Sequence, residues 1–415
     1  YGGYGRGRKM KKIKVLYDAT ILSAIEQKGE VRGGIFFVAY NILKKLQEDE
    51  RFDITLYLES SSHLKKIKEN NYLSSFPLQC ANYLTRDKYN NKSIKNLKFD
   101  SSKYDLYFNT ALMSDLDDDK IERFYVLYDA IPLILGDFFT KEGRLEFYGI
   151  YNRVFNKNTH CFCISQSCKN DFLRFFPILD ENKMKIAYIS SSQNFKPLKS
   201  RNFLADISKK YAINKNDKYI FSFCSLMPRK NLLFTTGCFL EFIDKYNIED
   251  LYFYLGGAGY KKALIESIEQ KYGEFYYKHK DKIKFLGYVD DKDVNIFYSN
   301  ALFFVYLSLY EGFGMPVLEA MQSGCAVVAS NNSSIPEVVN NCGICINPQD
   351  KKACIDAFDK LYFNPDIRNE LVQKGFIQSL NFNWDKTIKI ITDEIINVFK
   401  GEKINENSPC FFCGR

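Results

Sequence analysis

The stretch FFVYLSLYEGFGMPVLEAMQSGCAVVAS, residues 303–330, contains a complete strand, turn, helix and strand. Its first residues form an apolar run that is typical of a buried strand, and CAVVAS at its end forms a second one. Between them, two glycines and a proline precede VLEAMQSG, which has the apolar spacing of a helix, with Gly324 as its C-terminal cap. This order of elements indicates a parallel βαβ unit.

Two glutamates lie eight positions apart within this unit. Glu311 is predicted in the loop at the carboxyl end of the first strand, where α/β proteins bind ligands. Glu319 is predicted about one turn inside the helix. The helix start offers free N–H groups and the positive end of a dipole, and Pro316 near its first position removes no useful donor. We therefore expect an anion site here, flanked by carboxylates that accept hydrogen bonds from sugar and ribose hydroxyls.

A second turn supplies cations for the same anion. SLMPRKNL, residues 225–232, follows a predicted strand that begins at Lys218, so Arg229 and Lys230 also lie at the carboxyl end of a strand. Arginine gives bidentate contacts to phosphate oxygens and lysine gives a point charge. The combination is expected for a pyrophosphate.

The rest of the chain repeats the alternation of strands and helices. IKVLYDA, FDITLYL, KYDLYFN, RFYVLYD and HCFCIS are typical of strands in the first half, and helical patterns lie between several of them. A second series starts at Lys218, after a polar, lysine-rich stretch. We predict an α/β protein with two Rossmann-like, doubly wound domains that face a central cleft.

The predicted domain boundaries follow from these changes in pattern. They are a leader (1–9), a first Rossmann-like domain (10–195), a linker (196–216), a second Rossmann-like domain (217–385), a C-terminal helix packing back towards the first domain (386–400) and a tail (401–415).

Composition narrows the class of protein. A chain of 415 residues with 46% hydrophobic content exceeds what one core usually supports, which favours two domains. The apolar runs are shorter than the roughly 20 residues of a membrane-spanning helix, and no signal-peptide core begins the chain, so we expect a cytoplasmic protein. The net charge of +8 suits anionic ligands or peripheral contact with an anionic membrane surface, such as the inner face of the plasma membrane. Nucleic acid is not expected, because no nucleic-acid-binding signature is present.

Cysteine and histidine usage gives no sign of a metal site. The twelve cysteines are scattered through apolar segments, as small buried hydrophobic residues are. Two C-x-x-C pairs, Cys342/Cys345 and Cys410/Cys413, lie far apart, and the three histidines lie near neither. We expect reduced thiols, no cofactor and no catalytic metal.

Four consecutive blocks carry a family resemblance. SLMPRKNL, FLGYVDDKDV (285–294), YLSLYEGFGMPVLEAMQSGCAVVASNNSSIPEVV (306–339) and CGICINPQD (342–350) resemble the retaining glycosyltransferases of family 4, which have the two-domain GT-B fold. The most specific feature is the glutamate pair with seven residues between its members. The resemblance covers about residues 222–350 and implies a hexosyltransferase that uses a nucleotide diphosphate sugar.

The resemblance also implies that the first domain is the acceptor side and that the second domain binds the nucleotide sugar, with roles for particular residues of the second. Glu311 would contact the hydroxyls of the donor sugar and Glu319 the ribose, while Arg229 and Lys230 would hold the diphosphate. Val289, beside Tyr288, would line the base pocket. The phosphates and the sugar would meet the backbone of the turn and the start of the helix, at Gly312, Phe313, Gly314, Met315, Val317 and Leu318.

The resemblance is weaker in the first half. Gly33 and Gly34 are similar to the glycines of the family's first loop and would bring backbone N–H groups to the diphosphate. Asp129 stands where many relatives have His-Asp, with Tyr128 in place of the histidine, and would hold a sugar hydroxyl or the acceptor. Ser165 matches a serine at a strand end and is interpreted as structural.

The resemblance thus implies a retaining transferase of surface polysaccharide biosynthesis. The partners would be a nucleotide-sugar donor and a glycan, lipid-linked glycan or glycoprotein acceptor. The leaving phosphate would take the proton of the acceptor, so no dedicated base is required. This suits a chain that has only three histidines. The alternatives are a phosphorylase or disaccharide synthase on the same fold, and a non-catalytic subunit that binds nucleotide or glycan.

Overall fold

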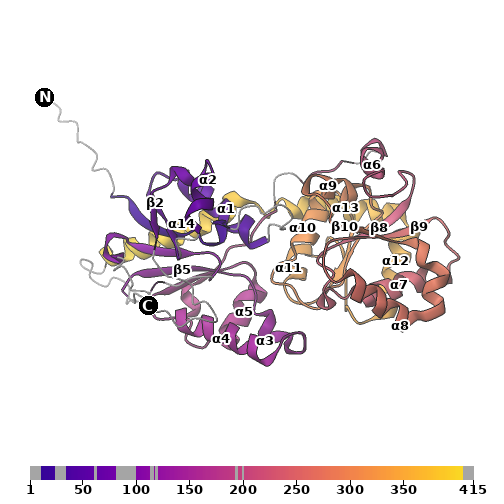
Figure 1. Cartoon of the computed structure of the whole chain (residues 1–415), viewed down its shortest axis with the longest axis horizontal. Coiled ribbons are helices and arrows are strands. Elements are labelled where there is room, and N and C mark those ends of the chain that lie inside the picture. The colour runs from indigo at the N-terminus through magenta and orange to yellow at the C-terminus, as the bar shows by residue number, and fades with distance from the viewer. Residues whose placement is uncertain are drawn as a thin grey trace, which may run out of the picture.

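The computed structural model describes residues 11–23, 34–59, 63–80, 100–112, 116, 120–191, 195–198 and 201–404. Two parallel sheets, each with helices packed on it, form two domains that lie end to end (Figure 1). The predicted fold class is therefore confirmed. In the described part of the chain, no helix has both the length and the apolar character needed to cross a bilayer.

The first sheet has seven strands in the order β3-β2-β1-β4-β5-β6-β7, all paired in parallel. Its strands are β1 (Ile13–Asp18), β2 (Phe52–Leu58), β3 (Leu78–Cys80), β4 (Leu106–Asn109), β5 (Glu122–Leu127), β6 (Thr159–Cys163) and β7 (Met184–Ile186). The helices of this domain are α1 (Gly34–Gln47), α2 (Leu64–Glu69), α3 (Ile131–Ile134), α4 (Lys141–Val154) and α5 (Gln166–Phe175). The central strands are almost wholly buried, as expected for a parallel sheet covered on both faces.

The second sheet has six strands in the order β10-β9-β8-β11-β12-β13, also parallel. They are β8 (Lys218–Phe223), β9 (Leu251–Gly256), β10 (Ile283–Gly287), β11 (Phe304–Tyr306), β12 (Val327–Ser330) and β13 (Ile344–Ile346). Strand order reverses between β8 and β11. Ligands of open α/β sheets bind at such a switch point, beyond the carboxyl ends of the strands.

Eight helices in the described part surround the second sheet, and a ninth leaves it. They are α6 (Arg201–Ser208), α7 (Leu232–Lys245), α8 (Lys261–His279), α9 (Asp291–Asn300), α10 (Met315–Gln322), α11 (Ile335–Val339), α12 (Lys351–Phe363), α13 (Pro365–Ser379) and α14 (Trp384–Ile404). Helix α10 ends as predicted, because Gly324 follows it with a positive φ of 70°.

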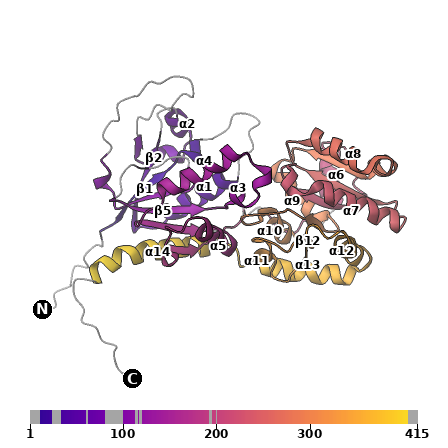
Figure 2. The same cartoon turned by 90° about the horizontal axis from the view of Figure 1, so that it is seen from below.

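Helix α14 returns to the first domain and packs against α1 (Figures 1 and 2). Lys45 of α1 lies 3.0 Å from Asp385, and Thr387 donates a hydrogen bond of 2.5 Å to the carbonyl of Tyr188. The indole of Trp384 donates to the carbonyl of Ser191 at 3.2 Å. The chain therefore crosses between the domains twice.

The predicted linker at 196–216 differs from the structure, because it contains helix α6. Leu204 and Ile207 are buried, and α6 packs against α9. Tyr211 then donates a hydrogen bond of 2.8 Å to Asp293 of α9. The polar composition of the segment hid an amphipathic helix, which makes most of this stretch part of the second domain.

Candidate active site

The two charged turns meet at the switch point of the second sheet. Arg229 and Lys230 lie in a short 3₁₀ turn, Pro228–Lys230, after β8, and Glu311 follows β11. The amide of Leu309 donates to the carbonyl of Arg229 at 2.9 Å, which ties the two loops together. The sequence prediction that these residues share one edge of the sheet agrees with this geometry.

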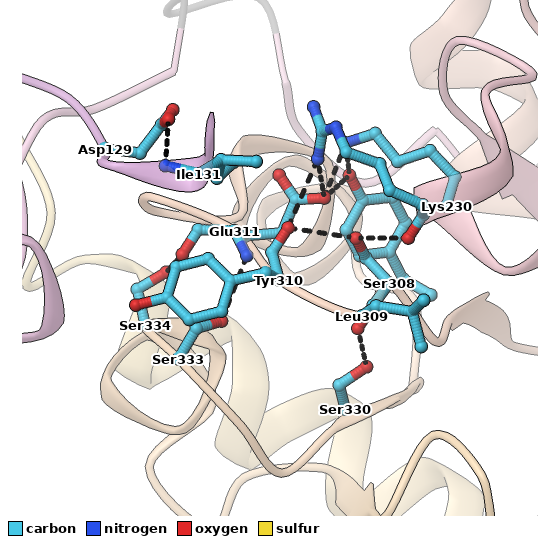
Figure 3. Close-up of polar contacts among 12 residues, drawn as sticks. Asp129, Ile131, Lys230, Ser308, Leu309, Tyr310, Glu311, Ser330, Ser333 and Ser334 are labelled. Atoms are coloured by element: carbon cyan, nitrogen blue, oxygen red, sulfur yellow. Dashed lines mark hydrogen bonds and ion pairs between the residues drawn. The ribbon is translucent and has the colours of Figure 1, made fainter. Parts of the chain in front are cut away.

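A buried carboxylate accepts three hydrogen bonds at this edge. Oε1 of Glu311 lies 2.5 Å from Nζ of Lys230, 3.2 Å from Nη1 of Arg229 and 2.9 Å from the hydroxyl of Tyr306 (Figure 3). Lys230 also donates to the Tyr306 hydroxyl at 2.6 Å. Glu311 and Lys230 are each only 8% exposed, so their charges attract each other through a poorly screened environment.

The two cations decide the charge state of Glu311. Burial acts to raise the pKa of this carboxyl, but the attraction of Lys230 and then of Arg229 outweighs it, and the pKa falls below its ordinary value. Glu311 is therefore ionised at neutral pH. The sequence analysis assigned the cations to a diphosphate and the carboxylate to a sugar, and it did not foresee that they contact one another.

The backbone of Glu311 is held by the loop before α11. Its amide donates to the hydroxyl of Ser333 at 3.0 Å, and the hydroxyl of Ser334 donates to its carbonyl at 2.9 Å (Figure 3). These serines follow β12, the neighbour of β11. Their position after a strand was a usable signal that the sequence analysis did not develop.

The turn after Glu311 requires glycine at two positions. A Cβ on Gly312 would lie 2.3 Å from the carbonyl oxygen of Tyr128 and 3.0 Å from Cβ of Asp129, in the first domain. Gly314 has a φ of 99°, and a Cβ there would lie 2.4 Å from Ile335. Gly312 thus lets the two domains come into contact beside Glu311.

Glu319 is the fifth of the eight residues of α10 and is half-buried. Its Oε2 accepts a hydrogen bond of 3.1 Å from the hydroxyl of Tyr298. Burial raises the pKa of Glu319 to about 8, an opposite shift to that of Glu311. A carboxyl with this pKa can donate or accept a hydrogen bond near neutral pH.

The first turn of α10 exposes little side-chain surface. The side chains of Val317 and Leu318 are fully buried, and that of Met315 is half-buried. Phe313 packs against Tyr188 and Phe382. Any ligand contact from these residues would come from the backbone, as the sequence analysis expected.

Asp129 comes from the first domain, just after β5 (Figure 3). It accepts a hydrogen bond of 3.1 Å from the amide of Ile131. Burial raises its pKa, and Arg229, Glu311 and Lys230 lie close enough to act on it electrostatically. The structure thus brings Asp129 to the predicted cluster from across the domain boundary.

The remaining predicted residues add little to the charged cluster. Gly33 lies outside the described residues, and Gly34 is the first residue of α1. Val289 is 1% exposed and faces Gly256, so its side chain offers no surface to a base, whereas Tyr288 is exposed. Tyr306 was missed because its place in a buried strand resembles a core residue.

No group of three or more metal-ligating side chains occurs in the part of the chain that the structure describes. The expectation that catalysis needs no metal stays a prediction.

Comparison with solved structures identifies the fold. The structure of Anabaena Alr3699/HepE in complex with UDP and glucose aligns with a TM-score of 0.67 at 15% identity, over 93% of this chain and 100% of that chain. This likeness defines a GT-B fold of two Rossmann-like domains.

Sequence comparison then relates the second domain to known glycosyl transferases. Residues 205–377 match the family model described as glycosyl transferases group 1. Serotype-specific mannosyltransferase WbdA of Escherichia coli is 26% identical over 286 residues, which are 67% of this chain and 34% of that protein. O-antigen chain mannosyltransferase B of Escherichia coli is 39% identical over 118 residues, 28% of this chain and 30% of that protein. The chain spans about a third of the length of the curated relatives that it matches first. The second domain is thus similar to the group 1 glycosyl transferases over residues 205–377.

Proposed function

We propose that this protein transfers a sugar from a nucleoside diphosphate donor to a glycan or glycoconjugate acceptor in the synthesis of a surface polysaccharide. The observation that carries the proposal is the cluster of Glu311, Lys230 and Arg229 at the switch point of the second sheet. The family match and the names of the polysaccharide mannosyltransferase relatives support it.

The cluster suits the charges that develop in the reaction. Cleavage of a sugar–phosphate bond leaves negative charge on the diphosphate, and fixed cations that need not reorganise stabilise that charge. Arg229, Lys230 and the N-terminus of α10 would supply positive charge, while Glu311 would hold hydroxyls of the sugar. Asp129 would bind the acceptor or a sugar hydroxyl from the first domain.

The donor sugar is a hexose in this proposal. Relatives named as mannosyltransferases make mannose the first sugar to test, and a neighbour solved with UDP and glucose makes glucose the second. Transfer would retain the anomeric configuration, with the leaving phosphate taking the proton of the acceptor. The pairing of Glu311 with two cations, which holds its pKa below the ordinary value, supports this route, because such a carboxylate is a weak base.

A thermal-shift panel of UDP, GDP, ADP and their hexose derivatives tests the proposal. A ligand that binds only the folded state raises the melting temperature, and the shift grows with the logarithm of its concentration relative to its dissociation constant. We expect the nucleotides of one base to give a clear stabilisation. In a separate assay of diphosphate release, the matching sugar nucleotide should be cleaved faster when a glycan acceptor is added. Absence of any shift with all three bases would refute the proposed function.

A further inference from the structure

The start of α5 is capped by a residue of the other domain. The first two amides of this helix, at Gln166 and Ser167, donate to the two carboxylate oxygens of Glu337 at 2.7 and 2.8 Å. Glu337 belongs to α11, which lies beside α5 in both views (Figures 1 and 2). A carboxylate at this position gains from charge-assisted hydrogen bonds and from the helix dipole.

The same end of α5 contacts both sides of the donor-site glutamate. The hydroxyl of Ser165 accepts from the amide of Cys168 at 2.9 Å and donates to the carbonyl of Gly312 at 2.7 Å. The hydroxyl of Tyr310 lies 3.0 Å from that of Ser167 and is also hydrogen-bonded to Asp171. Residues 310 and 312, which flank Glu311, are therefore both fixed from the first domain.

The segment around α11 holds the same loop from the second domain. Ser333 and Ser334 bind the backbone of Glu311, and Glu337 follows them by one turn. The donor loop, residues 310–314, is thus held between the start of α5 and the segment that carries Glu337. Movement of α5 away from this position would break contacts on both sides of Glu311 at once.

We propose that Ser165, Tyr310 and Glu337 are positioning residues, which set Glu311 for sugar transfer only while α5 is docked on the donor loop. The inference rests on the proposed function and extends it, because it makes donor-sugar geometry depend on the first domain. The cations proposed to hold the diphosphate, Arg229 and Lys230, lie in the second domain and are hydrogen-bonded to the donor loop, at Glu311 and the carbonyl of Tyr310, rather than to α5.

Three variants test the inference through a split between binding and turnover. Tyr310→Phe, Ser165→Ala and Glu337→Gln should each bind the nucleoside diphosphate within about twofold of the wild type, while kcat for sugar transfer falls by at least about tenfold, as expected when geometry at the reacting centre is lost. Ser165→Thr keeps the hydroxyl and should restore most of kcat. Glu370→Gln, an exposed residue that pairs with Lys374 on α13, is the control and should change neither quantity.

Hydrogen exchange gives a second measurement that does not depend on activity. In Glu337→Gln, the amides of Gln166 and Ser167 should exchange at least about tenfold faster, because their partner loses its charge, while those of α8 stay unchanged. Unchanged exchange at these amides, or kcat equal to that of a working wild type in all three variants, would overturn the inference. Failure of the proposed function would be seen instead in the wild type, as no binding of any nucleoside diphosphate.

Discussion

At the scale of single residues, the site depends on one buried ionised carboxylate. Glu311 would be costly to bury alone, since the charged form loses its hydration. Lys230 and Arg229 offset this cost of burial by pairing with the carboxylate, and Tyr306 adds a third donor to the same oxygen. These partners couple the stability of the site to its chemistry.

Replacement of Lys230 by methionine should therefore lower both the rate of sugar transfer and the stability of the fold. We expect the rate of sugar transfer to fall by at least about a hundredfold, as for loss of one fixed donor at a developing charge. The free energy of unfolding should fall by about 3 kcal/mol, because Glu311 keeps its burial and loses its nearest cation. Steady-state kinetics and urea unfolding measure the two effects.

The control for this variant is the double replacement Lys230→Met and Glu311→Gln. It removes the buried charge together with its partner, so part of the lost stability should return while transfer stays low. Stability losses that simply add for the two replacements would contradict the electrostatic account of the cluster.

Gly312 gives a steric prediction at the same scale. In Gly312→Ala, the new methyl group would lie 2.3 Å from the carbonyl oxygen of Tyr128, so the backbone must move where the domains touch. We expect kcat to fall by at least about tenfold, since displacements of about 1 Å at a reacting centre cost this much or more. The matched control is Gly149→Ala in α4, where a Cβ meets nothing within 4 Å. Equal activity of the two variants would show that the contact at Gly312 has no role.

At the scale of elements, α10 combines a helix start with a carboxyl whose pKa is shifted. Glu319 has a folded-state pKa of about 8 against an ordinary value of 4.5, because burial disfavours its charge. Between these pH values the folded state binds more protons at this residue than the unfolded state does. Its contribution to the free energy of unfolding is therefore lost as the pH rises.

Urea unfolding between pH 5 and pH 8 measures this effect. Glu319 should contribute a fall in the free energy of unfolding of up to about 1.4 kcal/mol per pH unit across this window. Glu319→Gln does not titrate, so the variant should show a flatter dependence than the wild type. Parallel pH profiles for the two proteins would mean that Glu319 ionises normally in the fold.

The elements themselves were largely predictable from local signals. The helix that follows Gly314 and its cap at Gly324 follow from apolar spacing and from glycine chemistry, and both agree with the structure. Helix α6 was missed because it is short and lies in a stretch that is polar and lysine-rich overall, which masks the apolar spacing of Leu204 and Ile207. Tyr306 was missed because the pattern of a buried strand does not show whether a tyrosine hydroxyl within it contacts a charged side chain.

At the scale of the whole molecule, the prediction of two facing domains is confirmed, but their contacts could not be predicted. Glu337 and Gln166 are 171 positions apart, and no local pattern relates a helix cap in one domain to a carboxylate in the other. Asp129 was placed near the site through a family resemblance, and its approach to Gly312 emerges only from the packed structure. Contacts of this kind depend on the tertiary arrangement and carry no periodic signal.

Calorimetric titration of the wild type and of Lys230→Met with UDP and with GDP tests the central claim most directly. If the charged cluster is the diphosphate site, one nucleotide binds the wild type and its affinity falls by at least about tenfold in the variant, the loss expected for one charge-assisted contact. If neither nucleotide binds the wild type, or if the variant binds as tightly, the cluster of Glu311, Lys230 and Arg229 is not a nucleotide-sugar site.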